Sequence, residues 1–286
     1  MSSLGRLFLF LLCLSLPLAG WAKIEAQAVS SFTVPNEWVG RLRAETIAHS
    51  CLIPSGGELH GYVISAQDAR ELSRAPLIVG INPQLEPWLA AWAKANQREN
   101  HLVWLHPDPL PSGSHLWTIP TEVKRMLGRL KIGMIKAGIK VSEVNERQLL
   151  NEIDAVEKDV WVTFATLLPH ERQFVTQHPG LERYAETFGL KVVGCLLESA
   201  SAESADPSAK HYAELLKSIR GQKVRVILCD EGQNPAATQQ LAKDAGLQPP
   251  TALSFEYLQK PGTPGDTWAS MMRLNARKLA EALKQP

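Results

Sequence analysis

Short β-rich apolar runs alternate with segments of helical apolar spacing along most of this chain, and this alternation constrains the fold more than any other feature. Strands alternating with helices form parallel sheets covered by helices, so the sequence predicts an α/β fold. The strands are expected at 28–32, 46–53, 77–81, 102–105, 173–176, 191–197, 224–229 and 252–257. The helices are expected at 36–43, 65–73, 88–95, 121–137, 144–168, 181–188, 209–220, 236–245 and 267–283.

A long stretch with few helix-breaking residues divides this pattern into two halves. We interpret residues 143–169 as a linker helix between an amino-terminal α/β lobe (23–142) and a carboxy-terminal α/β lobe (170–286). The chain is long enough for one large or two medium domains. The predicted architecture is therefore two lobes of parallel-rich sheets flanked by helices, joined by one long bridging helix.

The first 22 residues have the features of a secretory signal peptide. Arg6 supplies the positive charge, residues 7–18 form a short apolar run, and Gly20 and Ala22 are small residues at the −3 and −1 positions of a cleavage site. The run is short for a membrane span, and Cys13 lacks the small preceding residues of a lipid-modified cysteine. We therefore expect cleavage near Ala22 and a periplasmic location.

Charge and cysteine content exclude other classes of protein. The formal net charge of +1 argues against a nucleic-acid-binding surface. Cys51, Cys195 and Cys229 would remain after cleavage of the signal peptide. Two interpretations of these cysteines remain in an exported protein: a disulfide between two of them, or burial of each as a small apolar side chain. Their spacing does not match that of a structural zinc site.

Four potential metal ligands, His60, His115, His178 and Asp266, each lie where a predicted strand gives way to a loop or helix. Strand ends in an open α/β sheet converge on one crevice, so residues far apart in the chain can surround a single ion. Three imidazoles and one carboxylate suit a tetrahedral Zn²⁺ site, and Mn²⁺ is an alternative. Taken singly, each residue also fits an ordinary role, such as helix capping by Asp266.

Several segments together resemble a known family. They are 54–62 with Asp68, 85–89 (Leu-Glu-Pro-Trp-Leu), 115–120 (His-x-Trp-x-x-Pro), 176–190 (Thr-x-His, then Tyr and Phe-Gly-Leu) and 265–275 (Gly-Asp-Thr-Trp-Ala-Ser-Met-Met-Arg-Leu-Asn). Their order and spacing resemble the zinc- and manganese-binding solute receptors of bacterial ABC importers, which have two α/β lobes joined by a rigid helix. The resemblance implies that His60, His115, His178 and Asp266 bind the ion. It also implies a monomer that serves a membrane permease and its ATPase.

The chain departs from the family pattern beside these positions. Gly113-Ser114 stands where the family has Asp-Pro, and Ile119 where it has Asp; Leu59 replaces Pro, and Val63-Ile64 replace Glu-Pro. Groups next to metal ligands orient the imidazoles and raise their basicity. The affinity or the choice of metal is therefore expected to differ from that of other members. The chain also lacks a His-rich tract.

We interpret the chain as a periplasmic receptor, not an enzyme, that binds one divalent ion, with Zn²⁺ favoured over Mn²⁺. A periplasmic metal buffer, chaperone or sensor outside import is an alternative, because its binding chemistry would be the same. A secreted metallohydrolase is a second alternative, and it would need an open coordination position and a general base. Glu58 and Glu231 are the candidates for that base, or for a further contact with the ion.

The remaining histidines and three tryptophans are expected to have structural roles. The histidines, expected at the surface or in the core, are His49, His101, His106, His170 and His211. Trp88, Trp92 and Trp117 are expected to pack within the lobes, because their surroundings have helical apolar spacing.

Overall fold

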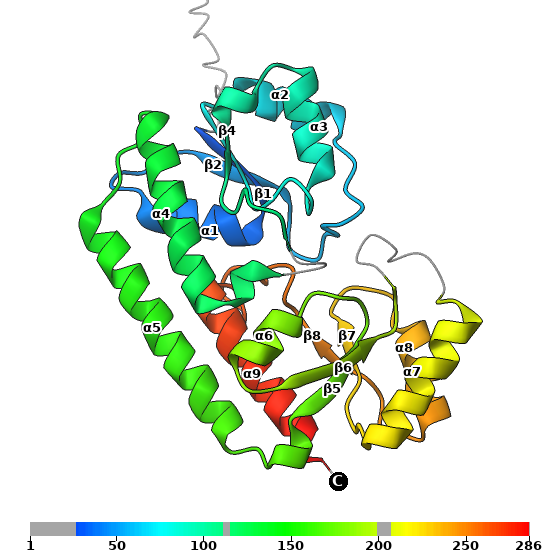
Figure 1. The fold of residues 1–286 in the computed structure, drawn as a ribbon. Coiled ribbons are helices and arrows are strands. Elements are labelled where there is room, and N and C mark those ends of the chain that lie inside the picture. Colours follow the sequence, from blue (N-terminus) through cyan, green and yellow to red (C-terminus); the bar gives the residue numbers. More distant parts are fainter. Residues whose placement is uncertain (1–26, 111–114, 199–206, 286) are drawn as a thin grey trace, which may run out of the picture.

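A computed structural model describes residues 27–110, 115–198 and 207–285 as a mixed α/β protein of parallel sheets flanked by helices (Figure 1). This confirms the predicted fold class. The amino-terminal half contains a four-stranded sheet of order β2-β1-β3-β4, in which every pair of strands is parallel. Its strands are β1 (Ala28–Phe32), β2 (His49–Ile53), β3 (Leu77–Gly80) and β4 (Leu102–Trp104). The predicted signal peptide and its cleavage site lie outside the described residues.

The helices of this half begin where the sequence provides helix-starting residues. Ser65 and Asp68 form a capping box at the start of α2, each side chain accepting a hydrogen bond from the other's backbone N–H. Pro87 and Pro120 occupy first turns, where a missing N–H costs no hydrogen bond. The helices are α1 (Thr33–Leu42), α2 (Ala66–Arg74), α3 (Pro87–Ala95), α4 (Pro120–Lys136) and the short 3₁₀ helices η1 (Glu99–His101) and η2 (Leu116–Thr118).

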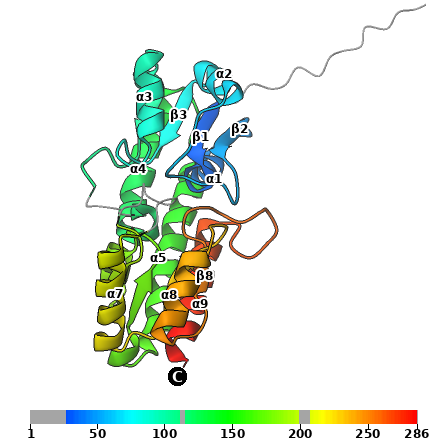
Figure 2. The same cartoon turned by 90° about the vertical axis from the view of Figure 1, so that its right-hand side faces the viewer.

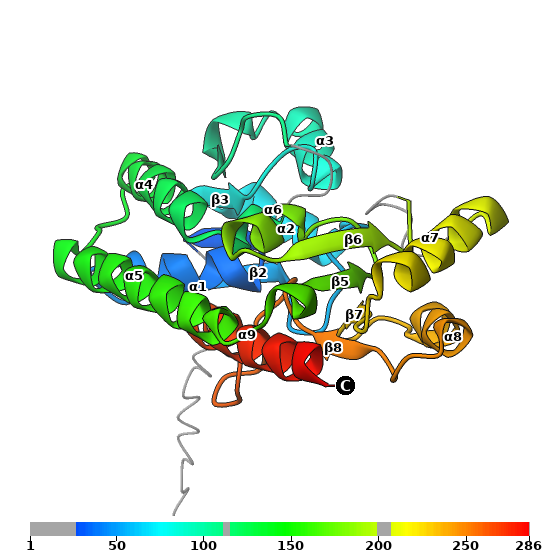
Figure 3. The ribbon, with the colours of Figure 1, turned by 60° about the horizontal axis from the view of Figure 1, so that its bottom comes forward.

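Helix α5 (Glu143–Ala165) is the longest described helix and contacts α1 and α4 as well as α9 (Trp268–Lys284) at the end of the chain. Figure 3 shows α5 and α9 side by side. The predicted helix continues to residue 168, but α5 ends at Ala165 because Pro169 disfavours a helical conformation before it. Pro169 instead opens a 3₁₀ turn, η3 (Pro169–Glu171).

The carboxy-terminal half has two parallel strand pairs, β5-β6 and β7-β8. A bridge between Val175 and Ile227 brings the two pairs together, so that β5 lies next to β7. The strands are β5 (Gln173–Thr176), β6 (Lys191–Cys195), β7 (Leu228–Asp230) and β8 (Thr251–Leu253). The remaining helices are α6 (Glu182–Thr187), α7 (Ala209–Gln222) and α8 (Ala236–Ala245).

Strand β8 is shorter than the predicted 252–257, and the difference changes the conformation of residues 254–257. Ser254 leaves the sheet because its backbone N–H and carbonyl bond to the side chain of Asn275 on α9, at 3.2 and 2.7 Å. The residues after Leu253 are therefore free of strand pairing and form a loop. Strand β7 begins at Leu228, later than the predicted residue 224, and the Val224 N–H bonds instead to the Ile219 carbonyl near the end of α7.

One apolar core extends through both halves of the molecule, which Figure 2 shows stacked one above the other. It includes Phe32 from the first strand, Trp117, and Phe255 and Trp268 from the end of the chain, all at most 1% exposed. The two halves are thus packed against each other rather than connected only by covalent linkers. Within the described ranges, no helix is both long and apolar enough to span a membrane.

Candidate metal centre

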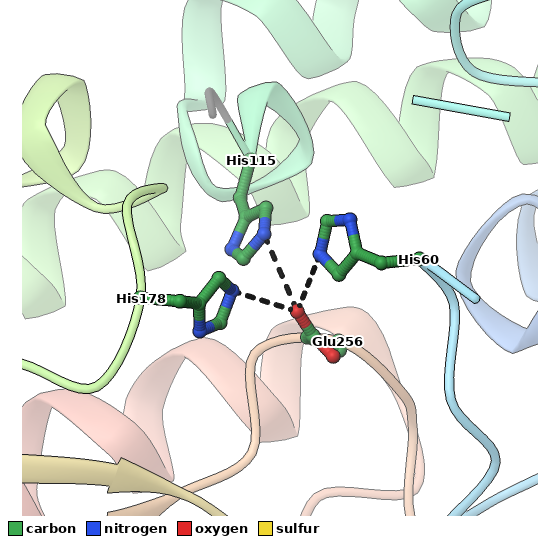
Figure 4. A group of neighbouring side chains, drawn as sticks. All are labelled: His60, His115, His178 and Glu256. Carbon is green, nitrogen blue, oxygen red and sulfur yellow. Dashed lines mark hydrogen bonds and ion pairs between the residues drawn. The ribbon is translucent and has the colours of Figure 1, made fainter. Parts of the chain in front are cut away.

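The three predicted histidines converge on one point, at the junction of the two halves. His60 lies in the loop after β2, His115 directly before η2, and His178 in the loop after β5. Figure 4 shows the three imidazoles turned toward the carboxylate of Glu256, in the loop after β8. One donor atom from each of these four side chains lies within 4.8 Å of all the others.

The arrangement matches the dimensions of a tetrahedral metal shell. Oε1 of Glu256 lies 2.9 Å from Nε2 of His60, 3.0 Å from Nε2 of His178 and 3.4 Å from Nε2 of His115. Zinc bonds of about 2.0–2.1 Å at tetrahedral angles would place neighbouring donor atoms about 3.3 Å apart. All four side chains are at most 6% exposed. They therefore fit a small, largely desolvated divalent cation.

Asp266 does not belong to this cluster, which corrects the sequence-based choice of carboxylate. Its Oδ2 accepts a hydrogen bond of 2.8 Å from the backbone N–H of Gly262, within the loop that precedes α9. Glu256, ten residues earlier, takes the fourth place. The prediction missed it because a strand extending to 257 would have placed Glu256 inside the sheet. The available signal was that Glu256 is the first carboxylate after the last strand.

A second carboxylate lies behind His178. Oδ2 of Asp230 lies 2.7 Å from Nδ1 of His178, the ring nitrogen that does not face Glu256. Its neighbour Glu231, the candidate expected from the sequence, has its side chain directed elsewhere, with Oε2 lying 3.6 Å from Nζ of Lys278. Consecutive residues at the end of a strand point to opposite sides, so only one of the two can reach the cluster.

His115 is held in a different way. Its ring stacks on the indole of Trp117, with centroids 4.7 Å apart and an interplanar angle of 26°. Neither of its ring nitrogens makes a hydrogen bond within the described ranges. Ile119, which replaces an Asp of the family pattern, is buried and offers no acceptor. Trp117 therefore packs in the core, as expected, and also supports a candidate ligand.

The loop that carries His60 is attached on both sides. Oγ of Ser55 donates a hydrogen bond of 2.6 Å to the carbonyl of Leu258, two residues after Glu256. On the other side, the hydroxyl of Tyr62 donates to Oδ2 of Asp68 at 2.8 Å. Gly56 permits the tight turn before His60, since its φ of 81° lies in the left-handed region. These bonds hold His60 close to the segment that carries Glu256.

Burial and mutual contacts set the charge states of the cluster. Burial lowers the pKa of His115 to about 3, so this imidazole is neutral at physiological pH. Burial acts against a charge on His178 too, but Asp230 and Glu256 outweigh it and raise the pKa of His178 well above its usual value. Burial acts to raise the pKa of Glu256, but hydrogen bonds from His178 and His60 hold it well below its usual range. Glu256 is therefore an ionised acceptor, as a metal ligand must be.

The other candidate residues lie outside the four-residue cluster. Glu58 is exposed, and Trp88 and Trp92 pack against the core. Nδ1 of His49 lies 2.8 Å from Oδ1 of Asn36, and Nε2 of His211 lies 2.8 Å from the carbonyl oxygen of Cys195. The remaining histidines outside the cluster are His101, His106 and His170. The three cysteines in the described ranges, Cys51, Cys195 and Cys229, are free thiols, so they form no disulfide with one another.

Comparison with known proteins points to metal uptake. A family model described as the periplasmic component A of zinc-uptake complexes, ZnuA, matches residues 28–282. The zinc-binding lipoprotein AdcA of Streptococcus pneumoniae is 23% identical, over 90% of this chain and 56% of its own length. The chain thus spans about half the length of that relative. A protein of Thermotoga maritima that has been proposed to bind metal is 24% identical, over 86% of this chain and 88% of its own length.

Solved structures show the same fold. The manganese-bound periplasmic metal-binding protein of Candidatus Liberibacter asiaticus superposes with a TM-score of 0.75 and 19% identity, over 90% of this chain and 98% of that one. A structure of TroA, from work on its metal-binding specificity, superposes with a TM-score of 0.74 and 16% identity, over 91% of this chain and 100% of that one. At this level of identity the likeness establishes the fold alone.

Proposed function

The chain belongs to the family of the periplasmic component A of zinc-uptake complexes, and from this membership we propose that it captures one divalent metal ion for import. In this proposal His60, His115, His178 and Glu256 bind the ion. The observation that carries the proposal is the convergence of these four donors, with side chains at most 6% exposed, from distant parts of the chain. Each of them follows or adjoins a different strand or short helix, so the site exists only in the folded protein.

The donor set favours binding over catalysis. Four protein donors complete a tetrahedral shell, whereas a catalytic zinc keeps one position open for water or substrate. Of the two carboxylates expected as a hydrolytic base, Glu58 is exposed and Glu231 pairs with Lys278. The ion is therefore proposed as cargo, held and later released.

We propose Zn²⁺ as the preferred ion. Three imidazoles suit Zn²⁺ better than Mn²⁺, which prefers oxygen donors, and the Irving–Williams order raises the affinity for Zn²⁺ further. The name of the AdcA relative, a zinc-binding lipoprotein, supports the same choice. Because protons compete with the metal for imidazole, affinity is expected to fall as the pH drops below about 6.

We also propose that the protein is a periplasmic monomer whose signal peptide has been removed. In this proposal it delivers the ion to an ABC permease and its ATPase. Family membership supports it, since the matched family is a component of uptake complexes. We further propose that residues 143–169 link the lobes 23–142 and 170–286, as the contacts of α5 with α1, α4 and α9 suggest. Stimulation of a partner permease–ATPase by the metal-loaded protein tests delivery. Its absence with every candidate partner would favour a buffer or sensor.

Metal content after competition tests the binding function. The protein, refolded free of metal and exposed to equal Zn²⁺ and Mn²⁺, should retain one Zn²⁺ per chain by mass spectrometry. His115→Ala should lose it, and His170→Ala, at an exposed histidine outside the cluster, should retain it. Retention of one Mn²⁺ would keep the receptor function and reverse the choice of metal. Absence of stoichiometric metal from the unmutated protein would refute the proposal.

A further inference from the structure

We propose that Asp230 is a positioning residue of the metal site, which holds the His178 imidazole with its Nδ1 protonated and its Nε2 turned toward the ion. The inference rests on the proposed metal-binding function, and it concerns a residue outside the four candidate ligands. The contact that carries it is the distance of 2.7 Å between Oδ2 of Asp230 and Nδ1 of His178.

The chemistry of the pair determines which nitrogen is available. The 2.7 Å contact places the carboxylate of Asp230 against Nδ1, where it can accept a hydrogen bond from a proton on that nitrogen. In a neutral imidazole the lone pair is then on Nε2, the atom that lies 3.0 Å from Oε1 of Glu256. Nδ1 and Nε2 point out of the ring in different directions, so Asp230 lies behind the ring and does not compete for the ion.

The fold places the two residues together without help from local sequence. Asp230 ends β7, and His178 follows β5 by two residues. Because β5 and β7 are adjacent and parallel through the bridge of Val175 and Ile227, their carboxyl ends share one edge. The backbone N–H of Asp230 also donates to the side chain of Gln177, the neighbour of His178, at 3.3 Å. The carboxylate thus has a fixed position relative to the imidazole.

The chain provides a matched control in the next residue. Glu231 has the same charge but pairs with Lys278 at 3.6 Å. If negative charge near the site were all that mattered, removing the charge of either residue would change zinc affinity. An orienting effect would appear only in Asp230, and it is expected to change metal affinity about 10–100-fold, as for other outer partners of metal-bound histidines.

The test combines zinc affinity, from competition with a chromophoric chelator, with NMR of zinc-loaded protein carrying ¹⁵N-labelled histidine. Asp230→Asn should weaken zinc binding about 10–100-fold and expose the Nδ1–H proton of His178 to exchange with water. Asp230→Glu should restore part of the affinity, and Glu231→Gln should leave it unchanged. Thermal unfolding of each metal-free variant identifies a general loss of structure. If Asp230→Asn does not fold, the same two readouts on Asp230→Glu decide.

Three outcomes would overturn the role of Asp230. Asp230→Asn could bind zinc as tightly as the unmutated protein, or Glu231→Gln could cause the same loss. The Nδ1–H proton of His178 could also remain protected in Asp230→Asn. An unmutated protein that takes up no stoichiometric zinc would instead refute the proposed function, which separates the two failures.

Discussion

The indole Nε1–H of Trp117 donates a hydrogen bond of 2.7 Å to the carbonyl oxygen of Phe255. Trp117 follows His115 by two positions and stacks on its ring, whereas Phe255 directly precedes Glu256. The carbonyl of Trp117 in turn accepts a hydrogen bond of 2.6 Å from the indole of Trp268, on α9. One buried residue therefore holds two candidate ligands from opposite halves of the chain.

Replacing this indole should weaken both the fold and the site. Trp117→Phe keeps an aromatic ring beside His115 but leaves the buried Phe255 carbonyl without its donor. An unpaired buried acceptor costs about 1–3 kcal/mol, so the free energy of unfolding of the metal-free protein should fall by at least that range. Zinc affinity should fall as well, because the loop before Glu256 loses a fixed contact. Urea unfolding and chelator competition measure the two effects.

Trp88→Phe is the control for the loss of ring size. Trp88 also packs against the core, but its Nε1 has no hydrogen-bond partner in the described part of the chain. Its replacement should therefore cost less stability and leave zinc affinity unchanged. Equal effects of the two substitutions would show that the hydrogen bond to Phe255 is not important.

The choice between the two carboxylates can be tested directly. Glu256→Gln removes the charge that lies 2.9–3.4 Å from all three imidazoles, and it should weaken zinc binding more than the roughly 10–100-fold typical of an outer partner. Asp266→Asn should leave the affinity unchanged, since Asp266 bonds to Gly262 outside the cluster. The reverse order of effects would restore Asp266 as the ligand.

Stability should depend on pH through Glu86, which lies completely buried before α3. Burial raises its pKa from 4.5 to about 7, although its Oε2 accepts hydrogen bonds from the N–H groups of Ile81 and Asn82. The folded state therefore binds this proton more tightly than the unfolded state. The contribution of protonated Glu86 is complete below pH 4.5 and is lost as the pH rises through about 7.

Glu86→Gln isolates this contribution, because glutamine keeps an oxygen acceptor but does not ionise. Between pH 4.5 and pH 7, the free energy of unfolding of the unmutated protein should fall by on the order of 3 kcal/mol more than that of the variant. Denaturant unfolding at several pH values measures it. Glu99→Gln, at an exposed position in η1, should follow the unmutated protein. Parallel curves for Glu86→Gln and the unmutated protein would contradict the assignment.

Metal binding should change the overall shape very little. Hydrogen bonds already connect the halves beside the site, from Ser55 to the Leu258 carbonyl at 2.6 Å and from the His115 N–H to the Gly180 carbonyl at 3.0 Å. Helix α5 also contacts helices of both halves. X-ray scattering should therefore give the same radius of gyration for the metal-free and zinc-loaded protein. A clear decrease with zinc that is absent from Glu256→Gln would indicate lobe closure instead.

The pattern of the sequence determined the parts of this protein that depend on local periodicity and on strand ends. The alternation of strands and helices predicted parallel sheets, and every strand pair in the described sheets is parallel. The three histidines lie beside predicted strand ends, and parallel strands collect such residues at one edge. His60 and His178 follow strands of different sheets, however, so their meeting also depends on how the two halves pack.

The carboxylates were decided only by the tertiary structure. Whether Glu256 lies in a strand or a loop depends on Asn275, which takes over the backbone of Ser254 from a position 21 residues away. Whether Asp230 or Glu231 faces His178 depends on the register in which this segment pairs with its neighbours, and a shift of one residue reverses the direction of every side chain. Both outcomes follow from long-range hydrogen bonds, which a local pattern does not contain.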